Sequence, residues 1–398
     1  MNMFLMSGFI GQILEQSLKA WSRASAVSVC LLTGVSAHAT LMMPDLGVAG
    51  TFNAFVLGNM EGYHSDVEGR LAVGGDLTLE NYSIGLQLSN SRGKRDDLIV
   101  GGNATFRNGR IYSGNAVVGG DNNIDSQYDE TDPDSGSVGL YRGEHTADPS
   151  GTVIESDKVP LDFDQIGNEL LAKSAAWGDW TPNGTVTKDE YGNIQFTGEG
   201  KRAVFNLCDD DGQQHALCAN GLADVNSFLF DIPRYTTAMI NVFNTDVTLS
   251  QLGFHHTAIA RHGENGELLG GHNKMRDNQP DFFRHNGELT NRILFNFVNA
   301  TSLNMNAIGF KGSLLAPKAA VNFYNGHIDG NLIAGSLTAP DLWGDSLEYA
   351  LDERLTAGQI NNYRYMDVPA PSTLSAFALG LLLLGFRTRR RRRYAWPA

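Results

Sequence analysis

Short runs of small and β-branched residues, each followed by a glycine pair and a polar residue, recur along the first third of the chain. Leu-Ala-Val-Gly-Gly-Asp begins at Leu71, Leu-Ile-Val-Gly-Gly-Asn at Leu98 and Ala-Val-Val-Gly-Gly-Asp at Ala116, which places the copies 27 and then 18 residues apart. A looser fourth copy begins at Leu332. A short strand, a tight corner and a return after about 20 residues are typical of a parallel β-helix, in which each turn of chain stacks on the last. The pattern predicts such a solenoid.

Alternating or continuous apolar runs predict further short strands at 185–187, 194–196, 238–242, 247–249, 293–297 and 303–305. Asn183-Gly184 and Gly192-Asn193 mark turns around the first two of them. The spacing of the runs also fits antiparallel hairpins in a β-sandwich, so this alternative stays open beside the favoured solenoid.

One segment has helical periodicity instead. Apolar residues recur there at intervals close to three and four: Phe163, Ile166, Leu170 and Trp177. Asp164 can cap the start and Gly178 can end the helix. We expect one amphipathic helix near 162–177, with its apolar side buried against the flank of the solenoid.

Composition supports a mainly β fold. Glycine makes up 45 of 398 residues and charged residues only 19%, where about 25% is usual, and this disfavours a helical bundle. The glycines follow no three-residue repeat, which excludes collagen. The net charge of −14 is concentrated in the body, because both terminal segments are basic. Such an acidic body repels phosphate backbones, so nucleic acid is not an expected partner.

The first 39 residues predict a secretory signal peptide. Lys19 and Arg23 precede an apolar stretch, which ends in the small-x-small tripeptide from Ala37 to Ala39. These are the parts that a signal peptidase substrate needs, and we expect cleavage after Ala39. The alternative is a buried helix or a membrane anchor.

The C-terminal end predicts a tether, a short membrane segment and a cytoplasmic tail. The tether ends in Val368, Pro369, Ala370, Pro371 and Ser372, whose prolines oppose helix and strand. The apolar run 374–386 is shorter than the ~20 residues that span a bilayer comfortably. The arginine-rich tail 387–398 is expected to stay in the cytoplasm, so the body faces outward.

This end resembles the PEP-CTERM sorting signal of Gram-negative bacteria, with Ala370 in the place of the family's glutamate. The resemblance implies processing by an exosortase, a membrane transpeptidase-like enzyme, and export linked to exopolysaccharide. The alternative is a tail anchor that is never cut.

The body resembles the choice-of-anchor A domain. The opening blocks are Phe52 to Gly58 and Ser65 to Asp76, and the closing ones include Leu294 to Phe297, Gly312 to Pro317 and Ile328 to Ala334. The resemblance covers 46–350 and implies an adhesive domain held by alternative surface anchors, which leaves 351–373 as the tether. A weaker likeness of layout connects the chain with ice-binding β-helix proteins and implies no shared function.

Cys208 and Cys218 are the cysteines that remain once Cys30 is removed with the signal peptide. A pair in an exported protein predicts a disulfide, and two cysteines without a second pair do not indicate a metal site.

Candidate chemistry elsewhere is sparse. A calcium loop would have ligands at its positions 1, 3 and 5, and these positions are matched by Asp121, Asn123 and Asp125. However, Ser126 stands where the loop needs glycine, and Asp132 where it needs glutamate. Calcium is therefore a weak candidate, and a solvated acidic excursion from the solenoid is favoured. Five histidines between 255 and 285 lack the helical spacing of a metal site.

Catalytic motifs are also missing from the sequence. Carboxylate pairs such as Asp96-Asp97 could serve a polysaccharide hydrolase or lyase, but nothing in the sequence orders them into a site. We therefore expect no enzyme and no cofactor.

The expected function is a secreted adhesive or matrix protein of the outer envelope of a Gram-negative bacterium, with a glycan or protein ligand. The alternatives are a glycan- or ice-binding module and, less favoured, a polysaccharide-active enzyme. No regular Thr-x-Thr ladder of the kind an ice binder would show is visible in the sequence.

Overall fold

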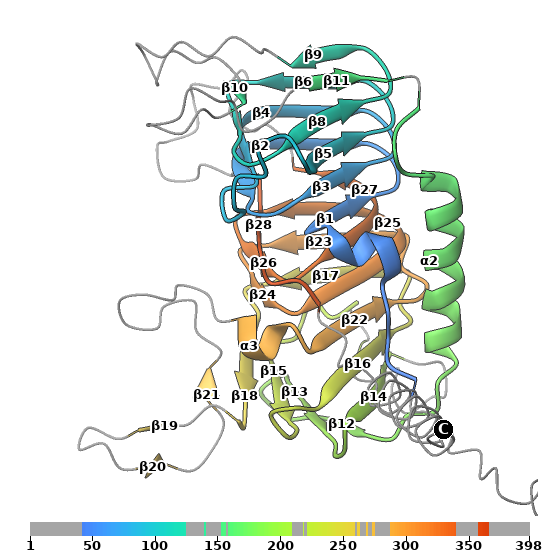
Figure 1. Cartoon of the computed structure of the whole chain (residues 1–398). Helices are drawn as coiled ribbons and strands as arrows, with labels where there is room; N and C mark the ends of the chain where they lie inside the picture. Colours follow the sequence, from blue (N-terminus) through green and yellow to red (C-terminus); the bar gives the residue numbers. More distant parts are fainter. Residues whose placement is uncertain are drawn as a thin grey trace, which may run out of the picture. The chain divides into compact units, whose positions relative to one another are not determined.

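The three glycine-pair runs form neighbouring rungs of one parallel β-solenoid in the computed structural model of the chain (Figure 1). Leu71, Leu98 and Ala116 are register partners in consecutive rungs. The structure describes residues 42–124, 139–140, 153–156, 158–208, 218, 221–258, 261–262, 268–269, 273–274, 287–339 and 357–365. Nearly all of these belong to one compact unit, Pro44–Val368, which contains the whole solenoid.

The first side of the solenoid, the helix face, is a parallel stack that pairs strands from distant parts of the chain. From one end to the other it contains β14 (Arg202–Leu207), β16 (Thr237–Val242), β22 (Ile293–Phe297), the start of β25 (Ser313–Tyr324), the start of β27 (Leu332–Thr338), β1 (Ala54–Val56), β3 (Leu71–Val73), β5 (Asp96–Val100), β8 (Asn115–Val118) and β11 (Val153–Glu155).

The second side, the polar face, stacks in the same direction. It contains β17 (Asp246–Ser250), β23 (Ser302–Asn306), the ends of β25 and β27, the starts of β2 (Met60–Val67) and β4 (Leu77–Ile84), β6 (Ala104–Arg107) and β9 (Asn122–Ile124).

The third side consists of shorter strands. One stack holds β24 (Gly309–Lys311), β26 (His327–Asp329), β28 (Gln359–Asn361), the ends of β2 and β4, β7 (Arg110–Ile111) and β10 (Gly139–Leu140). A second sheet contains β12 (Thr185–Lys188), β13 (Asn193–Thr197), β15 (Ser227–Asp231), β18 (Gly253–His256) and β21 (Asn273–Lys274). The remaining elements are β19 (Arg261–His262), β20 (Leu268–Leu269), the 3-10 helix η1 (Gly47–Thr51) and α3 (Gly287–Thr290).

The chain builds the stack in two passes. The first pass runs from β1 to β11, and after α2 (Phe163–Gly178) the second pass runs from β12 to β27. β27 then pairs in parallel with β1, so the last rung of the second pass lies directly beneath the first rung of the first. This parallel order confirms the predicted solenoid and excludes the sandwich of hairpins. Among the described strands, the antiparallel pairs are β12–β13, β18–β21 and β19–β20.

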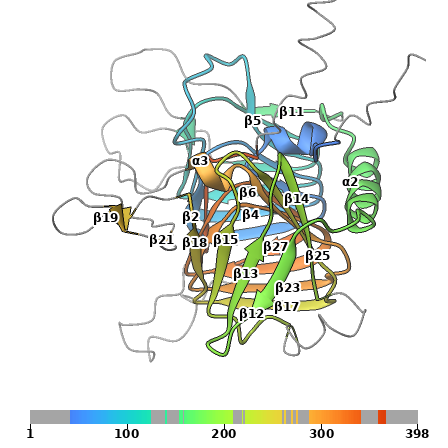
Figure 2. The ribbon, with the colours of Figure 1, turned by 90° about the horizontal axis from the view of Figure 1, so that it is seen from below.

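Two apolar cores result from the alternation of side chains along the helix face. Residues that point inward, such as Leu71, Leu98 and Phe295, fill the interior of the solenoid. Residues that point outward, such as Ile99 and Met239, form a second cluster with Leu170 and Trp177 of α2. Figure 2 shows α2 outside the ring of strands, where it covers this side. The sheet on this side is apolar on its inner and its outer surface, and α2 is needed to bury the outer one.

The predicted helix is confirmed, with one correction at its start. Its cap is Asp162 and not Asp164, because the Asp162 side chain accepts the Gln165 N–H at 2.9 Å while Asp164 lies in the first turn. Near the other end, a row of asparagines on the helix face binds helix carbonyls. Asn241 donates to the Trp177 carbonyl and Asn296 to the Ser174 carbonyl, both at 2.9 Å.

The predicted domain boundary at residue 350 lies too early. β28 pairs with β26 and with the end of β2, so residues 357–365 belong to the solenoid and not to the tether predicted for 351–373. Asn361 accepts a hydrogen bond from Asn53 at its carbonyl, and Arg364 donates to the Thr51 carbonyl. The segment 357–365 thus binds the residues that precede β1.

Candidate functional site

The polar face carries one continuous column of outward side chains, which we call the polar ladder. Its members are successive register partners on eight rungs: Thr248, Asn304, Asn322, Thr338, Glu61, Thr78, Thr105 and Asn123. Neighbouring rungs of a sheet lie about 4.8 Å apart. The column therefore presents hydroxyl and amide groups at a regular spacing along the solenoid axis.

Alternation within each strand produces the polar ladder. In β23, Leu303 and Met305 point into the core while Asn304 between them points outward. The side chains of the polar ladder are half-buried or exposed. The Asn322 side-chain amide donates to the Asn304 side-chain oxygen at 2.8 Å, which fixes the orientation of both amides. The ladder is thus partly organised before any ligand arrives.

A second row, the corner ladder, flanks the polar ladder and explains the glycine-pair repeat. Asn59, Asp76 and Asn103 each accept the backbone N–H of the equivalent residue one rung on, at 2.8–2.9 Å, and Asp121 ends the row. The glycines are required because a Cβ at Gly101 would clash with the Gly74 carbonyl oxygen below it. The repeat thus holds the rungs in register at this corner.

The polar face carries exposed acids on its first-pass rungs. Asp76 and Asp121 of the corner ladder and Glu61 of the polar ladder are exposed. Glu80 is the register partner of Arg107, so one acid faces a base across neighbouring rungs. Such a face repels polyanions and offers hydrogen-bond donors and acceptors to a neutral, hydroxyl-rich surface.

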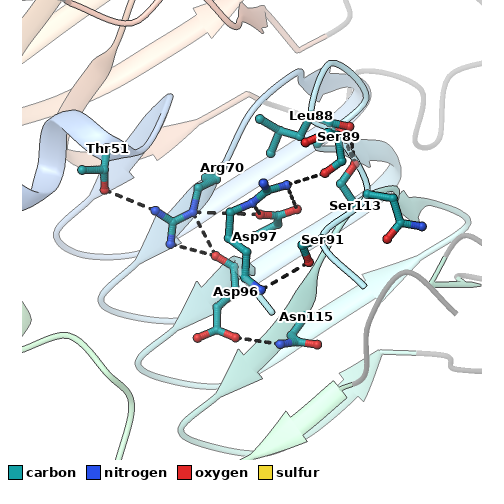
Figure 3. A network of polar contacts seen from close by, with 12 residues as sticks. Thr51, Arg70, Leu88, Ser89, Ser91, Asp96, Asp97, Ser113 and Asn115 are labelled. Atoms are coloured by element: carbon teal, nitrogen blue, oxygen red, sulfur yellow. Dashed lines mark hydrogen bonds and ion pairs between the residues drawn. The ribbon is translucent and has the colours of Figure 1, made fainter. Parts of the chain in front are cut away.

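Asp96 and Asp97, the carboxylate pair considered for a polysaccharide-active enzyme, make separate structural contacts (Figure 3). Asp97 is fully buried and accepts two hydrogen bonds from Arg95, at 2.5 and 3.1 Å. Asp96 accepts from the Asn115 amide at 3.0 Å, and its carbonyl binds Arg70. In this arrangement the two carboxylates do not face a common substrate position.

The electrostatics of this network agree with a structural role. The hydrogen bond to Asp97 raises the pKa of Arg95, whereas burial lowers the pKa of Arg70. The Arg70 guanidinium also lies 4.0 Å from the centre of the Phe52 ring and donates to the Thr51 hydroxyl. The network therefore joins β3 and β5 to the segment that precedes β1.

The structure joins Cys208 and Cys218 in a disulfide, with their Cα atoms 5.4 Å apart. Both cysteines are buried and belong to the interior core. The bond closes the segment between β14 and β15 at the base of the second pass.

Of the three calcium candidates, Asp121 and Asn123 are described and Asp125 lies outside the described residues. Asn123 belongs to β9, an extended strand paired with β6, and not to a curved loop. Among the residues that the structure describes, no group of three His, Cys, Asp or Glu side chains could hold a metal ion. The absence of a cofactor stays a prediction, with calcium binding as its weak alternative.

The histidine-rich segment is described only in part. His256 is buried, stacks on Phe230 and accepts the Ala258 N–H at 2.9 Å, whereas His255 points to the other side of β18. His272 and His285 lie outside the described residues. His256 thus has a structural contact in the core.

The two predicted targeting segments lie outside the described residues. These are the signal peptide with Ala37 and Ala39, and the sorting motif Val368–Ser372 with the apolar run and arginine tail that follow it. Within the described ranges, no helix has the length and apolar character needed to cross a membrane.

The polar ladder is the site that reasoning from the sequence missed. Each strand shows its polar residues in the sequence, but the rung order does not follow the chain. Thr338 and Glu61 are neighbours only because β27 lies beneath β1 and β2. Four threonines share the column, yet they come from both passes and form no Thr-x-Thr repeat along the chain.

Two comparisons relate the chain to known proteins. A family model described as "Putative Ice-binding-like adhesive domain" matches residues 45–342. Curated proteins give no match. Among solved structures, the chain is similar to an ice-binding protein from the Antarctic ascomycete Antarctomyces psychrotrophicus, at 10% identity and a TM-score of 0.26, over 82% of this chain and 98% of that one. The family match covers most of the solenoid, and the chain therefore belongs to the family of ice-binding-like adhesive domains.

Proposed function

We propose that this protein is an exported, surface-attached adhesin whose polar ladder binds an extended neutral polysaccharide. The observation that carries the proposal is the ladder itself, with eight hydroxyl, amide or carboxyl groups in one column. A linear polymer can contact several rungs at once, and the weak contacts then add through multivalency. The family match supports the adhesive role.

The charge of the polar face favours a neutral ligand. Exposed Asp76, Asp121 and Glu61 would repel acidic polymers, whereas carboxylates and amides bind sugar hydroxyls well. The disulfide suits an oxidising compartment outside the cytoplasm.

Binding of the soluble fragment 40–367 to insoluble cellulose tests the proposal, with alginate as the acidic comparison. Thr105 has neutral register partners, Thr78 and Asn123, so Thr105→Lys places a long, charged side chain between two neutral rungs of the ladder. We expect binding to cellulose to weaken about tenfold or more, a loss of at least ~1.4 kcal/mol. Equal binding by the wild type and Thr105→Lys would contradict a role for the ladder.

Thr187→Lys is the matched control. Thr187 is an exposed threonine on β12, in the antiparallel pair and away from the polar face. We expect this variant to bind cellulose as the wild type does, because it adds the same charge elsewhere on the surface.

Ice is the second candidate ligand, and the four threonines of the ladder favour it. Thr248, Thr338, Thr78 and Thr105 offer methyl and hydroxyl groups in one column. Against it, Glu61 interrupts the column and strongly hydrated acids flank it. Inhibition of ice recrystallisation by the wild type, lost in Thr105→Lys and with no binding to cellulose, would identify ice as the ligand.

The route to the cell surface is the second part of the proposal. We propose attachment as a choice-of-anchor A protein of a Gram-negative envelope, with an exosortase-type enzyme cutting near Pro369 to Ser372 and the arginine tail left in the cytoplasm. Mass spectrometry of extracellular protein should find Arg387–Ala398 missing. Finding the tail attached to most of the extracellular protein would exclude this route.

A further inference from the structure

A lysine and an aspartate are buried together where the third side of the solenoid turns toward the helix face. Lys311 ends β24 and Asp329 ends β26, and the two residues are register partners on adjacent rungs. Their side chains are 3% and 0% exposed, and the Lys311 Nζ lies 2.6 Å from the Asp329 Oδ2. A buried ion pair must overcome a large loss of hydration, so as a stabilising device it is weak.

We propose that Lys311 and Asp329 condense to form an intramolecular isopeptide bond. A proton moves from the ammonium group to the carboxylate, which leaves a neutral amine beside a neutral acid. A bond then forms between Nζ of Lys311 and Cγ of Asp329, the Cγ–Oδ2 bond breaks, and one water molecule leaves. The ion pair contains all the atoms of the amide and the water, so the step needs no oxidant, reductant or cofactor.

The neighbours of the pair suit this reaction. The His327 Nε2 lies 3.0 Å from the Lys311 Nζ, where its imidazole can take a proton from the attacking nitrogen and return it to the leaving oxygen. The Asn361 amide donates to the Asp329 Oδ1 at 2.6 Å, on the oxygen that becomes negative in the tetrahedral intermediate.

Position and burial also favour the amide product. Register pairing holds the nitrogen near the carbonyl carbon, which replaces a bimolecular encounter with an oriented contact. Once water has left, a site this dry slows the reverse hydrolysis.

The bond would join two rungs at a point that carries load in a surface-attached protein. β26 pairs directly with β28, the strand nearest the C-terminus among the described residues. Force applied through the C-terminus acts first on β28, and a covalent link one rung away would stop the peeling of β26 from β24. This consequence goes beyond the proposed ligand and holds for any ligand of the polar ladder.

Peptide mapping of the full chain, denatured, reduced and digested with trypsin, tests the bond. An acylated Lys311 is not cut, so the linked product is peptide 293–318 joined to 319–354, lighter than their sum by one water. We expect this product in most of the folded wild type and its absence in Lys311→Arg. Separate peptides 293–311, 312–318 and 319–354 as the main products of folded wild-type protein would overturn the proposal, whether or not the variant folds.

A time course on newly translated protein tests the role of His327. We expect His327→Gln to slow the appearance of the linked peptide about 100-fold, the scale of general base catalysis, while the circular dichroism spectrum stays that of the wild type. Unchanged kinetics in a folded His327→Gln would remove the histidine from the reaction.

Discussion

The first and second passes of the chain form one solenoid but fill its interior with different kinds of side chain. The first-pass rungs, β1 to β11, have a mainly aliphatic interior, with side chains such as Leu71, Leu98 and Val100 and the two aromatic residues Tyr82 and Phe106. Their glycine corners are bound by the corner ladder. The interior of the second-pass rungs, β13 to β24, is rich in phenylalanine: Phe196, Phe205, Phe228, Phe230, Phe254, Phe295, Phe297 and Phe310. Rings contact one another there at centroid distances from 5.0 to 6.4 Å.

The difference shows two ways to keep rungs in register. In the first pass, backbone approach at the corners sets the spacing, so small residues are required at fixed positions. In the second pass, the corners between β16 and β17 and between β22 and β23 contain no glycine pair, and the interlocking rings provide the specificity. The stability of the second pass should therefore depend on the size of its buried side chains. The stability of the first pass should depend on having no side chain at the glycine corners.

Phe295→Ala should have the largest effect. The Phe295 ring contacts those of Phe228, Phe230, Phe297 and Phe310, and its removal leaves a cavity among rigid neighbours. We expect a loss of about 4–5 kcal/mol in the free energy of unfolding, measured by urea denaturation.

Leu98→Ala is the matched truncation in the first pass, where the register partners Leu71 and Ala116 are aliphatic. We expect it to cost about 3 kcal/mol. A greater loss for Leu98→Ala than for Phe295→Ala would contradict the contrast between the two interiors.

Gly101→Ala should damage the first pass at its corner. The new methyl group would overlap the Gly74 carbonyl oxygen, and a backbone atom cannot relieve the overlap by a change of rotamer as a side chain can. We expect a loss of about 2–3 kcal/mol by urea denaturation.

The control for this variant is Gly167→Ala in α2. Its methyl group would meet only the end of the Leu57 side chain, and alanine favours the helix by about 1 kcal/mol over glycine. Equal losses in the two variants would show that glycine is not needed at the corner for close approach.

Asn296→Ala tests the contact of the second pass with α2. The Asn296 amide binds the Ser174 carbonyl and the Asn241 side chain, and its oxygen accepts from the Ser174 hydroxyl at 2.6 Å. Because these partners are buried, their loss should cost about 1–3 kcal/mol in urea denaturation. Asn304→Ala, on the solvated polar ladder, should cost only about 0.5 kcal/mol, and a similar loss in both would argue against a role in holding the helix.

The same contrast explains how far the sequence predicted the fold. The first pass was visible because its corners need Gly-Gly-Asp/Asn at each rung, and Leu71, Leu98 and Ala116 proved to be stacked partners. The helix was visible from Phe163, Ile166 and Leu170, whose side is buried against an outward apolar face.

What the sequence did not show depends on contacts between distant segments. The insertion of β1 above β27 is a tertiary pairing that no local pattern encodes, and it decides the membership of the polar ladder. The pairing of Lys311 with Asp329 was likewise hidden, because 18 residues separate them and each appears alone in its strand. The late boundary of the domain has the same cause, since Ile360 of β28 completes the rung that holds Val67.

The smallest expected effect concerns the hairpin β12–β13, where the second pass begins. Asp189 accepts hydrogen bonds from the side chain and the backbone of Asn193 and from the Tyr191 N–H, and these bonds hold the pKa of its carboxyl below the ordinary value of 3.8. Because the folded pKa is lowered, the contribution to stability is present above pH 3.8 and is lost as pH falls through the folded pKa. Hydrogen exchange in β12 and β13 should therefore quicken at low pH while β3 and β5 stay protected. Asp189→Asn should flatten this pH dependence, and Asp179→Asn, just after α2, should leave it as in the wild type. An unchanged pH dependence in Asp189→Asn would show that the hairpin is held by its strand pairing alone.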